Sequence, residues 1–319
     1  MKPDGFLADV LRKPDVLSRL AATLAEGNPW ETVVPKGTER VVLLGMGSSA
    51  YAGGVAAARL RARGVIATSE LASSTLIPAW GAGTLVVATS ASGGSVETLD
   101  ALTRLPAGTR TVAVTNTPDS AITAACDAVV ELRAETEIGG VACRSFQHTL
   151  ALLLALECHL TGTDLTALAD TVSAAAQASA HLIDTESDWR PAVSELLIGP
   201  QGIHLAAPAH RFCSAQQGAL MFREGPRLPA VGCETGDWSH VDVYLTKTTD
   251  YRLLTFAGSA WEHQLAEWTT ARNSTVVGVG GTVPGAGYEL RYPGDTDDDV
   301  RLLTEVLVPE LIAARAWGP

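Results

Sequence analysis

Short apolar runs alternate with helix-like stretches along the first half of the chain. The runs are rich in β-branched residues and apolar at successive positions, so both of their faces would be buried. They lie at 40–44, 64–70, 84–90, 111–116 and 128–132. Strands buried on both faces and separated by helices are typical of a parallel sheet that helices cover on both sides. The pattern therefore predicts an α/β fold.

The second half of the chain repeats this rhythm more faintly. Strand candidates lie at 202–207, 251–256, 274–280 and 288–292, and helical patterning lies at 4–25, 144–182, 210–224, 259–272 and 297–316. We therefore expect an N-terminal helical segment at 1–36 and two tandem modules at 37–185 and 195–319, joined near 183–195. Each module is expected to be a parallel sheet flanked by helices, a three-layer α/β/α sandwich.

Composition and charge remove several function classes. The 319 residues carry a formal net charge of −12, which argues against nucleic acid as a partner. No stretch approaches the ~18 apolar residues of a membrane helix, and the first residues do not resemble a signal peptide. The five cysteines and seven histidines follow no metal-ligand spacing. We therefore expect a cytoplasmic protein with reduced thiols, no bound metal and no membrane association.

The first candidate loop, 45–53, follows the first strand and opens a helix. Its glycines let the backbone approach a ligand, and the helix N-terminus offers free N–H groups to an anion. A dinucleotide site is an alternative, because Gly45, Gly47 and Ala50 fit G-x-G-x-x-A and Glu70 ends the next strand. An ordinary tight turn is the third interpretation.

The second candidate loop, 89–98, also follows an apolar run. It holds the hydroxyls of Ser90, Ser92, Ser95 and Thr98, with two glycines between them. Hydroxyl and N–H donors at the start of a helix suit a phosphate monoester, whereas a plain Ser/Gly linker is the alternative. Loops that follow strands of one parallel sheet can meet in the crevice where such sheets bind ligands.

The third candidate region contains an acid and a histidine. Glu224 is expected in the last turn of a helix that Gly225 and Pro226 stop, and there the helix dipole should raise the pKa of the carboxyl group. A general base and a solvated surface glutamate are both compatible with this position. His240 follows a polar turn at 236–239, where a catalytic and an incidental role are both possible.

These motifs, taken in order along the chain, resemble the sugar isomerase (SIS) family. The resemblance extends in particular to the isomerase half of glucosamine-6-phosphate synthases and to fructosamine-phosphate deglycases. It rests on 45–49 for the first glycine loop, 90–95 for S-x-S-G-x-T/S, Thr115-Asn116 with Ser120 for T-N-x-x-x-S, 137–142 for E-x-G-V-A, 218–224 for G-A-L-K-x-x-E and 236–240 for G-E-x-x-H.

The resemblance implies a role for each matched segment. The phosphate of a hexose 6-phosphate would be held by the loops of the first module, and Glu224 would move a proton between C1 and C2 of the sugar. His240 would assist ring opening in the site of a neighbouring protomer, which implies a homodimer. No cofactor is implied. The implied phosphosugar-binding residues are Gly47, Ser48, Ser49, Ser90, Ser92, Gly93, Ser95, Gly140 and Val141.

Two departures from the family narrow the expected chemistry. The synthases use a lysine in a C-terminal tail, and this sequence has no lysine beyond Lys247, so synthesis through that Schiff base and glutaminase activity are not expected. The second module has 204–212 where a glycine–serine loop would stand, so we expect one sugar site per chain.

Three hypotheses follow from the sequence. The first is an enzyme, an aldose–ketose isomerase, deaminase or deglycase that acts on a hexose 6-phosphate or its amine adduct. The second is a non-catalytic phosphosugar sensor or regulatory protein. The third is a nicotinamide-dependent dehydrogenase, which leaves the serines of 90–95 without a role.

Several other residues keep two interpretations. Trp238 could line the sugar site or pack in the core, and Arg144 could meet an anion or stay on the surface. His148 and His159 are expected to pack in the core.

Overall fold

The computed structural model describes residues 1–318 and divides into two compact units. One, here the first unit, comprises Val16–Thr136 and Arg144–Val172. The other, the second unit, comprises Met1–Asp15, Glu137–Cys143 and the chain from Ser173 onward. Short segments from the start and the middle of the chain thus pack with the C-terminal half. The module boundaries 37–185 and 195–319 stay a prediction.

The first unit is built on a five-stranded parallel sheet in the order β2-β1-β3-β4-β5. Its strands and helices, with the two helices that begin or end in the second unit, are α2 (Lys13–Glu26), β1 (Arg40–Gly45), α3 (Ser48–Ala62), β2 (Ile66–Leu71), β3 (Thr84–Thr89), α4 (Val96–Thr103), β4 (Arg110–Thr115), α5 (Ala121–Ala125), β5 (Ala128–Glu131), α6 (Arg144–Thr161) and α7 (Leu165–Asp184).

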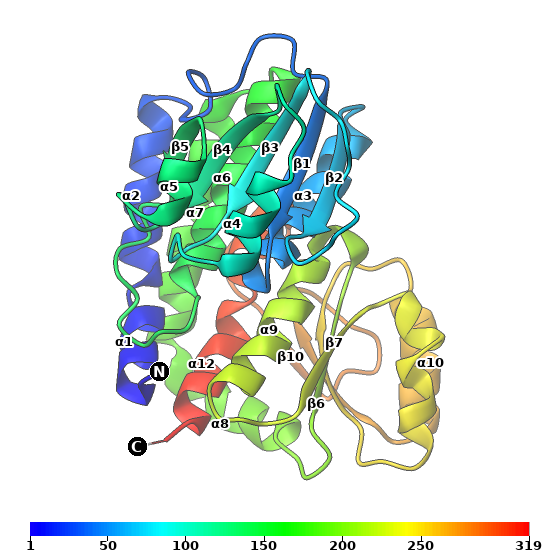
Figure 1. The fold of residues 1–319 in the computed structure, drawn as a ribbon. Coiled ribbons are helices and arrows are strands. Elements are labelled where there is room, and N and C mark those ends of the chain that lie inside the picture. The colour runs from blue at the N-terminus through cyan, green and yellow to red at the C-terminus, as the bar shows by residue number, and fades with distance from the viewer. Residues whose placement is uncertain (319) are drawn as a thin grey trace. The chain divides into compact units, whose positions relative to one another are not determined.

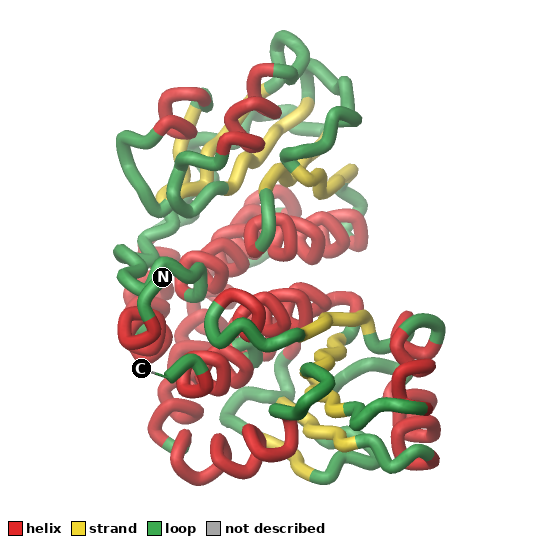
Figure 2. The backbone as a smooth tube through the Cα atoms, turned by 60° about the horizontal axis from the view of Figure 1, so that its bottom comes forward, coloured by secondary structure: helices red, strands yellow, loops and turns green. Residues whose placement is uncertain are grey.

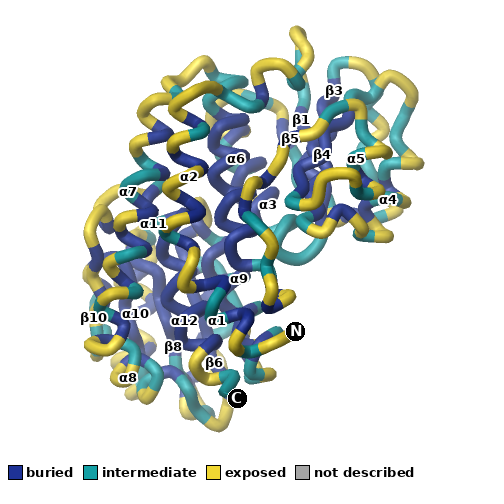
Figure 3. The backbone as a smooth tube through the Cα atoms, turned by 90° about the vertical axis from the view of Figure 1, so that its left-hand side faces the viewer, coloured by how far each residue is buried: buried dark blue, intermediate teal, exposed yellow. Residues whose placement is uncertain are grey.

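Helices cover both faces of this sheet, as its two-sided apolar strands require. In Figure 1, α4 and α5 lie on the face toward the viewer, and α3 and α6 lie behind the sheet. Val42, Val86 and Ala113 pack on the first of these faces with Ala101 of α4 and Ile122 of α5. Because successive side chains of a strand point to opposite faces, the intervening valines and leucines face α3 and α6. Figure 3 shows how α6 is buried along most of its length.

The second unit holds a second five-stranded parallel sheet, in the order β10-β9-β8-β6-β7. Its elements are α1 (Pro3–Leu11), α8 (Glu186–Leu197), β6 (Ile203–Ala207), α9 (Phe212–Glu224), β7 (Ala230–Glu234), β8 (Arg252–Phe256), α10 (Glu262–Ala271), β9 (Thr275–Val279), β10 (Tyr288–Leu290), α11 (Asp298–Thr304), α12 (Leu307–Ala316) and the 3₁₀ helices η1 (Ala209–Arg211), η2 (Asp237–Ser239) and η3 (Asp242–Lys247).

The two sheets have the same strand order. In each, the first strand in sequence lies between the second and the third, and the fourth and fifth follow on the side of the third. Figure 2 shows helices and strands in both units, and most strands are separated in sequence by helices. The predicted α/β fold with parallel sheets flanked by helices is therefore confirmed.

Three predicted helices are each divided in two, and one helix was missed. Arg12 separates α1 from α2, Gly162 with a φ of +69° lies between α6 and α7, and the last helical stretch becomes α11 and α12. Helix α8 lies in the segment predicted to be the joint, and it contains Pro191. In residues 1–318, no helix combines the length and the apolar character needed to cross a membrane.

Candidate functional site

Two neighbouring strands of the first sheet end in the two predicted ligand loops. Strand β1 pairs with β3 in parallel, so the loops at their carboxyl ends leave the same edge of the sheet. Gly47 precedes the first residue of α3 with a φ of +50°, a left-handed conformation that favours glycine. Ser48 and Ser49 then form the first turn of α3, where backbone N–H groups have no helical partner.

The loop after β3 is tightly folded. Ser95 is the N-cap of α4, and its Oγ accepts hydrogen bonds from the backbone N–H of Thr98 at 3.3 Å and from the Thr98 hydroxyl at 3.0 Å. The backbone N–H of Ser95 donates to Ser90 Oγ at 3.4 Å. Ser90 is buried, whereas the side chain of Ser92 is exposed. The structure therefore brings Ser90 and Ser95 together and leaves Ser92 facing outward.

Gly93 is the residue around which this loop closes. It has a φ of +68°, and a Cβ added to it would lie 2.0 Å from the hydroxyl oxygen of Ser120. Ser120 Oγ is itself buried without a hydrogen-bond partner. The segment after β4 also holds the loop, because Asn116 N–H and the Thr115 hydroxyl both donate to the carbonyl of Ala91. Thr115, Asn116 and Ser120, which match a family motif in the sequence, thus form the contact between the segment after β4 and the loop after β3.

Glu224 is the last residue of α9 in the second unit, as predicted. Burial raises the pKa of its carboxyl group above the ordinary value, and the nearby carboxylate of Glu137 raises it further. The guanidinium groups of Arg227 and Arg223 oppose this rise. A carboxyl group that is half-buried beside another acid suits proton transfer at neutral pH.

The segment 137–143, which contains Gly140 and Val141, is tied to the helix that carries Glu224. Gln217 of α9 donates a hydrogen bond from Nε2 to the carbonyl of Ala142 at 2.8 Å. Gly140 is exposed with a φ of +70°, whereas Val141 is buried as a whole residue. Of these two predicted sugar-binding residues, the structure therefore exposes only Gly140.

Helix α1 holds the same segment from another direction. Asp9 accepts a hydrogen bond from Gly139 N–H at 2.7 Å, and the backbone N–H of Lys2 donates to the carbonyl of Gly139 at 3.0 Å. A Cβ on Gly139 would lie 2.4 Å from the backbone of Phe6, so glycine is needed for this approach. Sequence reasoning missed the roles of Asp9 and Gln217. The signal for Gln217 was its position about two helical turns before Glu224, on the same helix face.

His240 lies at the end of η2, and its side chain is exposed. Trp238 is fully buried and belongs to the core of the second unit, so the packing interpretation holds and the site-lining one does not. The second unit thus contains both Glu224 and His240, whereas the predicted serines all belong to the first unit.

Arg144 is a second residue whose role the structure decides. It is fully buried, so a surface role is wrong, and its guanidinium donates to the carbonyls of Ala134 and Thr136. His148 packs in the core as expected, with Nδ1 2.7 Å from the carbonyl of Leu132. His159, expected in the core, is partly exposed near the end of α6.

In the second sheet, the loop that corresponds to the one after β3 follows β8, and a side chain of the protein accepts hydrogen bonds from its N–H groups. After β8, Glu262 Oε1 accepts hydrogen bonds from the backbone N–H groups of Gly258 at 2.5 Å and Ser259 at 2.9 Å. These donors correspond in the strand order to those of the loop after β3. An internal carboxylate at this place repels a phosphate.

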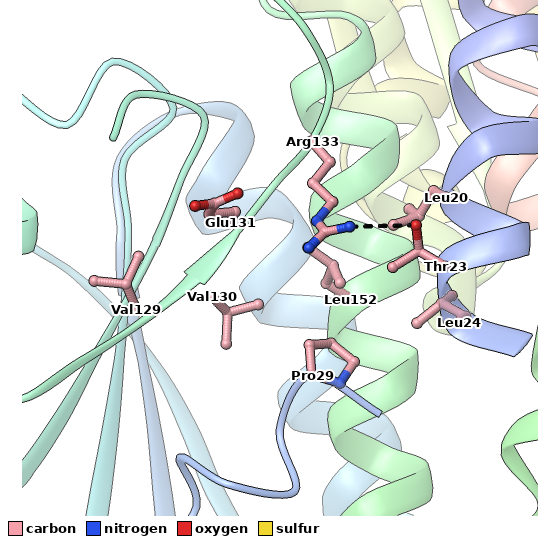
Figure 4. A pocket seen from close by; sticks show the side chains of 9 residues that line it. All are labelled: Leu20, Thr23, Leu24, Pro29, Val129, Val130, Glu131, Arg133 and Leu152. Carbon is pink, nitrogen blue, oxygen red and sulfur yellow. Dashed lines mark hydrogen bonds between the residues drawn. The ribbon is translucent and has the colours of Figure 1, made fainter. Parts of the chain in front are cut away.

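Two cavities of the first unit lie outside the predicted site. One of about 290 Å³ lies at the carboxyl ends of β4 and β5. The other, of about 240 Å³, has an apolar floor, and Figure 4 shows Arg133 at its rim, pointing toward Thr23. Neither is lined by a residue predicted to bind phosphosugar. Within residues 1–318, no group of three His, Cys, Asp or Glu side chains could hold a metal ion.

Comparison with known protein families gives a match over part of the chain. The SIS domain model matches residues 36–157. No curated protein matches the chain in sequence.

Solved structures match almost the whole chain at low identity. The C-terminal domain of glucosamine-fructose-6-phosphate aminotransferase from Francisella tularensis is 16% identical with a TM-score of 0.82, over 98% of this chain and 96% of that one. Tagatose-6-phosphate ketose/aldose isomerase from Escherichia coli is 16% identical with a TM-score of 0.76, over 97% and 91%. Glucosamine-6-phosphate deaminase from Thermotoga maritima is 16% identical with a TM-score of 0.73, over 98% and 93%. The chain therefore matches the SIS domain model at residues 36–157 and shares, over nearly its full length, the fold of these three solved structures.

Proposed function

We propose that this protein is a phosphosugar aldose–ketose isomerase, or a deaminase or deglycase with the same proton-transfer step. Its substrate would be a hexose 6-phosphate or the amine adduct of one. The observation that carries the proposal is the pair of donor loops at the carboxyl ends of β1 and β3 in a SIS-domain sheet. Serine hydroxyl groups and the N-terminal turns of α3 and α4 there can bind a phosphate without a lysine.

Glu224 is the proposed base. In the open-chain sugar, a carbon next to the carbonyl carries an acidic proton, and a base that removes it and returns it to the neighbouring carbon interconverts aldose and ketose. The raised pKa of Glu224 keeps the carboxyl group able both to take and to give back a proton. His240 would carry the proton between the sugar hydroxyl and the ring oxygen when the ring opens.

We further propose that the second unit is a second SIS module that has lost its own phosphate site. Its sheet has the strand order of the first sheet, and Glu262 accepts hydrogen bonds from the N–H groups of the loop after β8, which corresponds to the loop after β3. One sugar site per chain follows from this proposal. Glutaminase activity is not part of it. With five free thiols, a cytoplasmic location is part of the proposal.

A homodimer completes the proposal. Large apolar side chains are exposed close to His240 in sequence, namely Val241, Tyr244 and Leu245, and Trp261 lies against Gly236 of the same turn. Exposed large apolar side chains are the kind of surface that a protein–protein interface covers. A second copy of the chain packed there would bring His240 to the site of its neighbour.

The test is a panel of hexose 6-phosphates and fructosamine 6-phosphates, assayed for aldose, ketose and free amine. We expect turnover of at least one member by the wild-type protein, and a loss of about 10²- to 10⁴-fold in kcat for Glu224→Gln. Glu267→Gln, at an exposed position of α10, is the matched control and should keep the wild-type rate. Full activity in Glu224→Gln would remove the assigned base. Melting shifts with phosphosugars but without any turnover would favour the sensor function instead.

A further inference from the structure

One phenol oxygen holds the chain on both sides of His240. Trp238, two residues before the histidine, donates a hydrogen bond from Nε1 to Tyr251 Oη at 2.8 Å. The same hydroxyl donates to a carboxylate oxygen of Asp242, two residues after the histidine, at 3.4 Å. The side chain of Tyr251 therefore links the residues on either side of His240 through two hydrogen bonds.

Tyr251 is itself fixed by its surroundings. Its side chain is 1% exposed, and its ring stacks on the imidazole of His204, with centroids 4.1 Å apart and an interplanar angle of 26°. The ring of Trp238 approaches it edge-on, with centroids 6.2 Å apart. His204 Nδ1 also lies 3.5 Å from the Asp242 carboxylate. We call His204, Trp238, Asp242 and Tyr251 the tyrosine cluster.

Contacts outside the tyrosine cluster hold the flanking backbone. Glu234 accepts hydrogen bonds from the N–H groups of Gly236 at 2.8 Å and Asp237 at 2.9 Å. Arg272 donates to the carbonyl of Val243 at 2.8 Å. The backbone before and after His240 is thus held at several points, while its imidazole is exposed.

Packing alone does not require this arrangement. Trp238 and Tyr251 belong to an apolar core that includes Leu253 and Leu265, whereas Asp242 is only partly buried. Burying an indole N–H and a phenol in such a core is unfavourable unless each finds a hydrogen-bond partner. Buried polar networks of this kind select one geometry among several of similar packing energy. The geometry selected here is that of the turn that carries His240.

We propose that Tyr251 is a positioning residue for the ring-opening step, acting through Trp238 and Asp242 to hold His240 in place. The inference rests on the proposed function, because it presumes that His240 moves the proton that opens the sugar ring. It predicts that the Tyr251 hydroxyl matters for substrates that arrive as rings and not for substrates that arrive open.

The test compares fructose 6-phosphate with 5-deoxyfructose 6-phosphate, which lacks the C5 hydroxyl and cannot close a furanose ring. In Tyr251→Phe we expect kcat/KM for the ring substrate to fall about 10- to 100-fold, and that for the open substrate to stay within about twofold of wild type. Tyr292→Phe is the matched control, because that tyrosine is also buried but its hydroxyl has no hydrogen-bond partner. It should leave both substrates unaffected. Equal losses on both substrates, or no loss on either, would overturn the proposal.

A second readout separates this proposal from the proposed function. The imidazole NMR signals of His240, assigned by their absence in His240→Asn, should move or broaden in Tyr251→Phe and not in Tyr292→Phe. If no phosphosugar is turned over but these signals change, the proposed function fails and the positioning of His240 stands. Unchanged signals would overturn the positioning whatever the activity. Should Tyr251→Phe not fold, Trp238→Phe removes the indole donor, keeps an aromatic ring in the core and is read in the same way.

Discussion

The side-chain amide of Gln217 donates a hydrogen bond of 2.8 Å to the backbone carbonyl of Ala142. Gln217 is fully buried on α9, the helix that ends in Glu224, and Ala142 follows Val141 in the segment matched to E-x-G-V-A. A proposed sugar-binding segment and the helix of the proposed base are therefore joined by one side chain.

The first prediction concerns this bond. Gln217→Met keeps the length and bulk of the side chain but removes the donor, so the segment 137–143 should lose its tether to α9. We expect the KM for the phosphosugar to rise about tenfold with a melting temperature close to that of wild type. Gln216→Met, one residue earlier and partly exposed, is the control. An unchanged KM in Gln217→Met would show that the tether is not needed for binding.

The pH profile of the reaction tests the surroundings of Glu224. The neighbouring Glu137 raises the pKa of Glu224, and Arg227 lowers it. A base must be deprotonated to act, so the acid limb of kcat/KM follows this pKa. Glu137→Gln should move the acid limb to lower pH, and Arg227→Gln should move it to higher pH. Shifts in the same direction, or none in either variant, would contradict the assignment of the limb to Glu224.

Two adjacent glycines provide a test of the phosphate loop. In Gly93→Ala the new Cβ meets Ser120 Oγ at 2.0 Å on a backbone with a φ of +68°, whereas a Cβ on Gly94 meets nothing within 4 Å. We expect Gly93→Ala to lose about 1–3 kcal/mol of unfolding free energy and the stabilisation by phosphosugar, and Gly94→Ala to keep both. Thermal melting with and without hexose 6-phosphate measures the two effects. A phosphosugar shift that survives in Gly93→Ala would place the phosphate elsewhere.

The fourth prediction concerns a buried ion pair. Lys13 Nζ lies 2.5 Å from Glu310 Oε2, both side chains are fully buried, and burial raises the pKa of Glu310 to about 7. Because the unfolded chain releases this proton near the ordinary value of 4.5, the raised pKa makes stability fall as pH rises from about 4.5 to about 7, and the contribution levels off above that pH. In Lys13→Met the carboxyl group loses the partner that lowers its pKa, so it stays neutral in the folded protein to higher pH, and holding that proton costs more stability as the pH rises.

We therefore expect Lys13→Met to cost about 3–5 kcal/mol at pH 8 and clearly less at pH 5. The double variant Lys13→Met/Glu310→Leu, which removes both charges, should recover much of the loss at pH 8. Urea unfolding at the two pH values measures this. A loss in Lys13→Met that does not depend on pH would show that the Glu310 carboxyl group is not its cause.

Subunit mixing tests the proposed dimer. If His240 acts in the site of its neighbour, a heterodimer of Glu224→Gln and His240→Asn chains has one site with both wild-type residues. Mixing and refolding the two inactive variants in equal amounts should then restore about a quarter of the wild-type activity, given a twofold symmetric dimer. Each variant refolded alone is the control. No recovery in a mixture that sedimentation shows to be dimeric would mean that His240 serves its own chain.

Much of the fold could be predicted from the sequence because the signals are local. The apolar runs at 40–44, 84–90 and 111–116 became β1, β3 and β4, and the glycine and serine positions of 90–95 became the closed loop before α4. Strand burial, turn conformation and helix capping depend on residues close together in the chain. Helix α8 was missed because it contains Pro191 and several polar residues, a composition that resembles that of a linker.

The sequence by itself determined the kind of fold, the loops that follow β1 and β3 and the place of Glu224 at a helix end. Only the tertiary structure decided that Trp238 and Arg144 are buried, that Gln217 holds Ala142, and that Tyr251 holds the turn of His240. The physical reason is distance along the chain. Lys13 and Glu310 are 297 positions apart, and no periodicity or turn residue records such a partner. Which buried polar groups find one another is decided when whole helices and sheets pack, since each must replace the hydrogen bonds it loses to water.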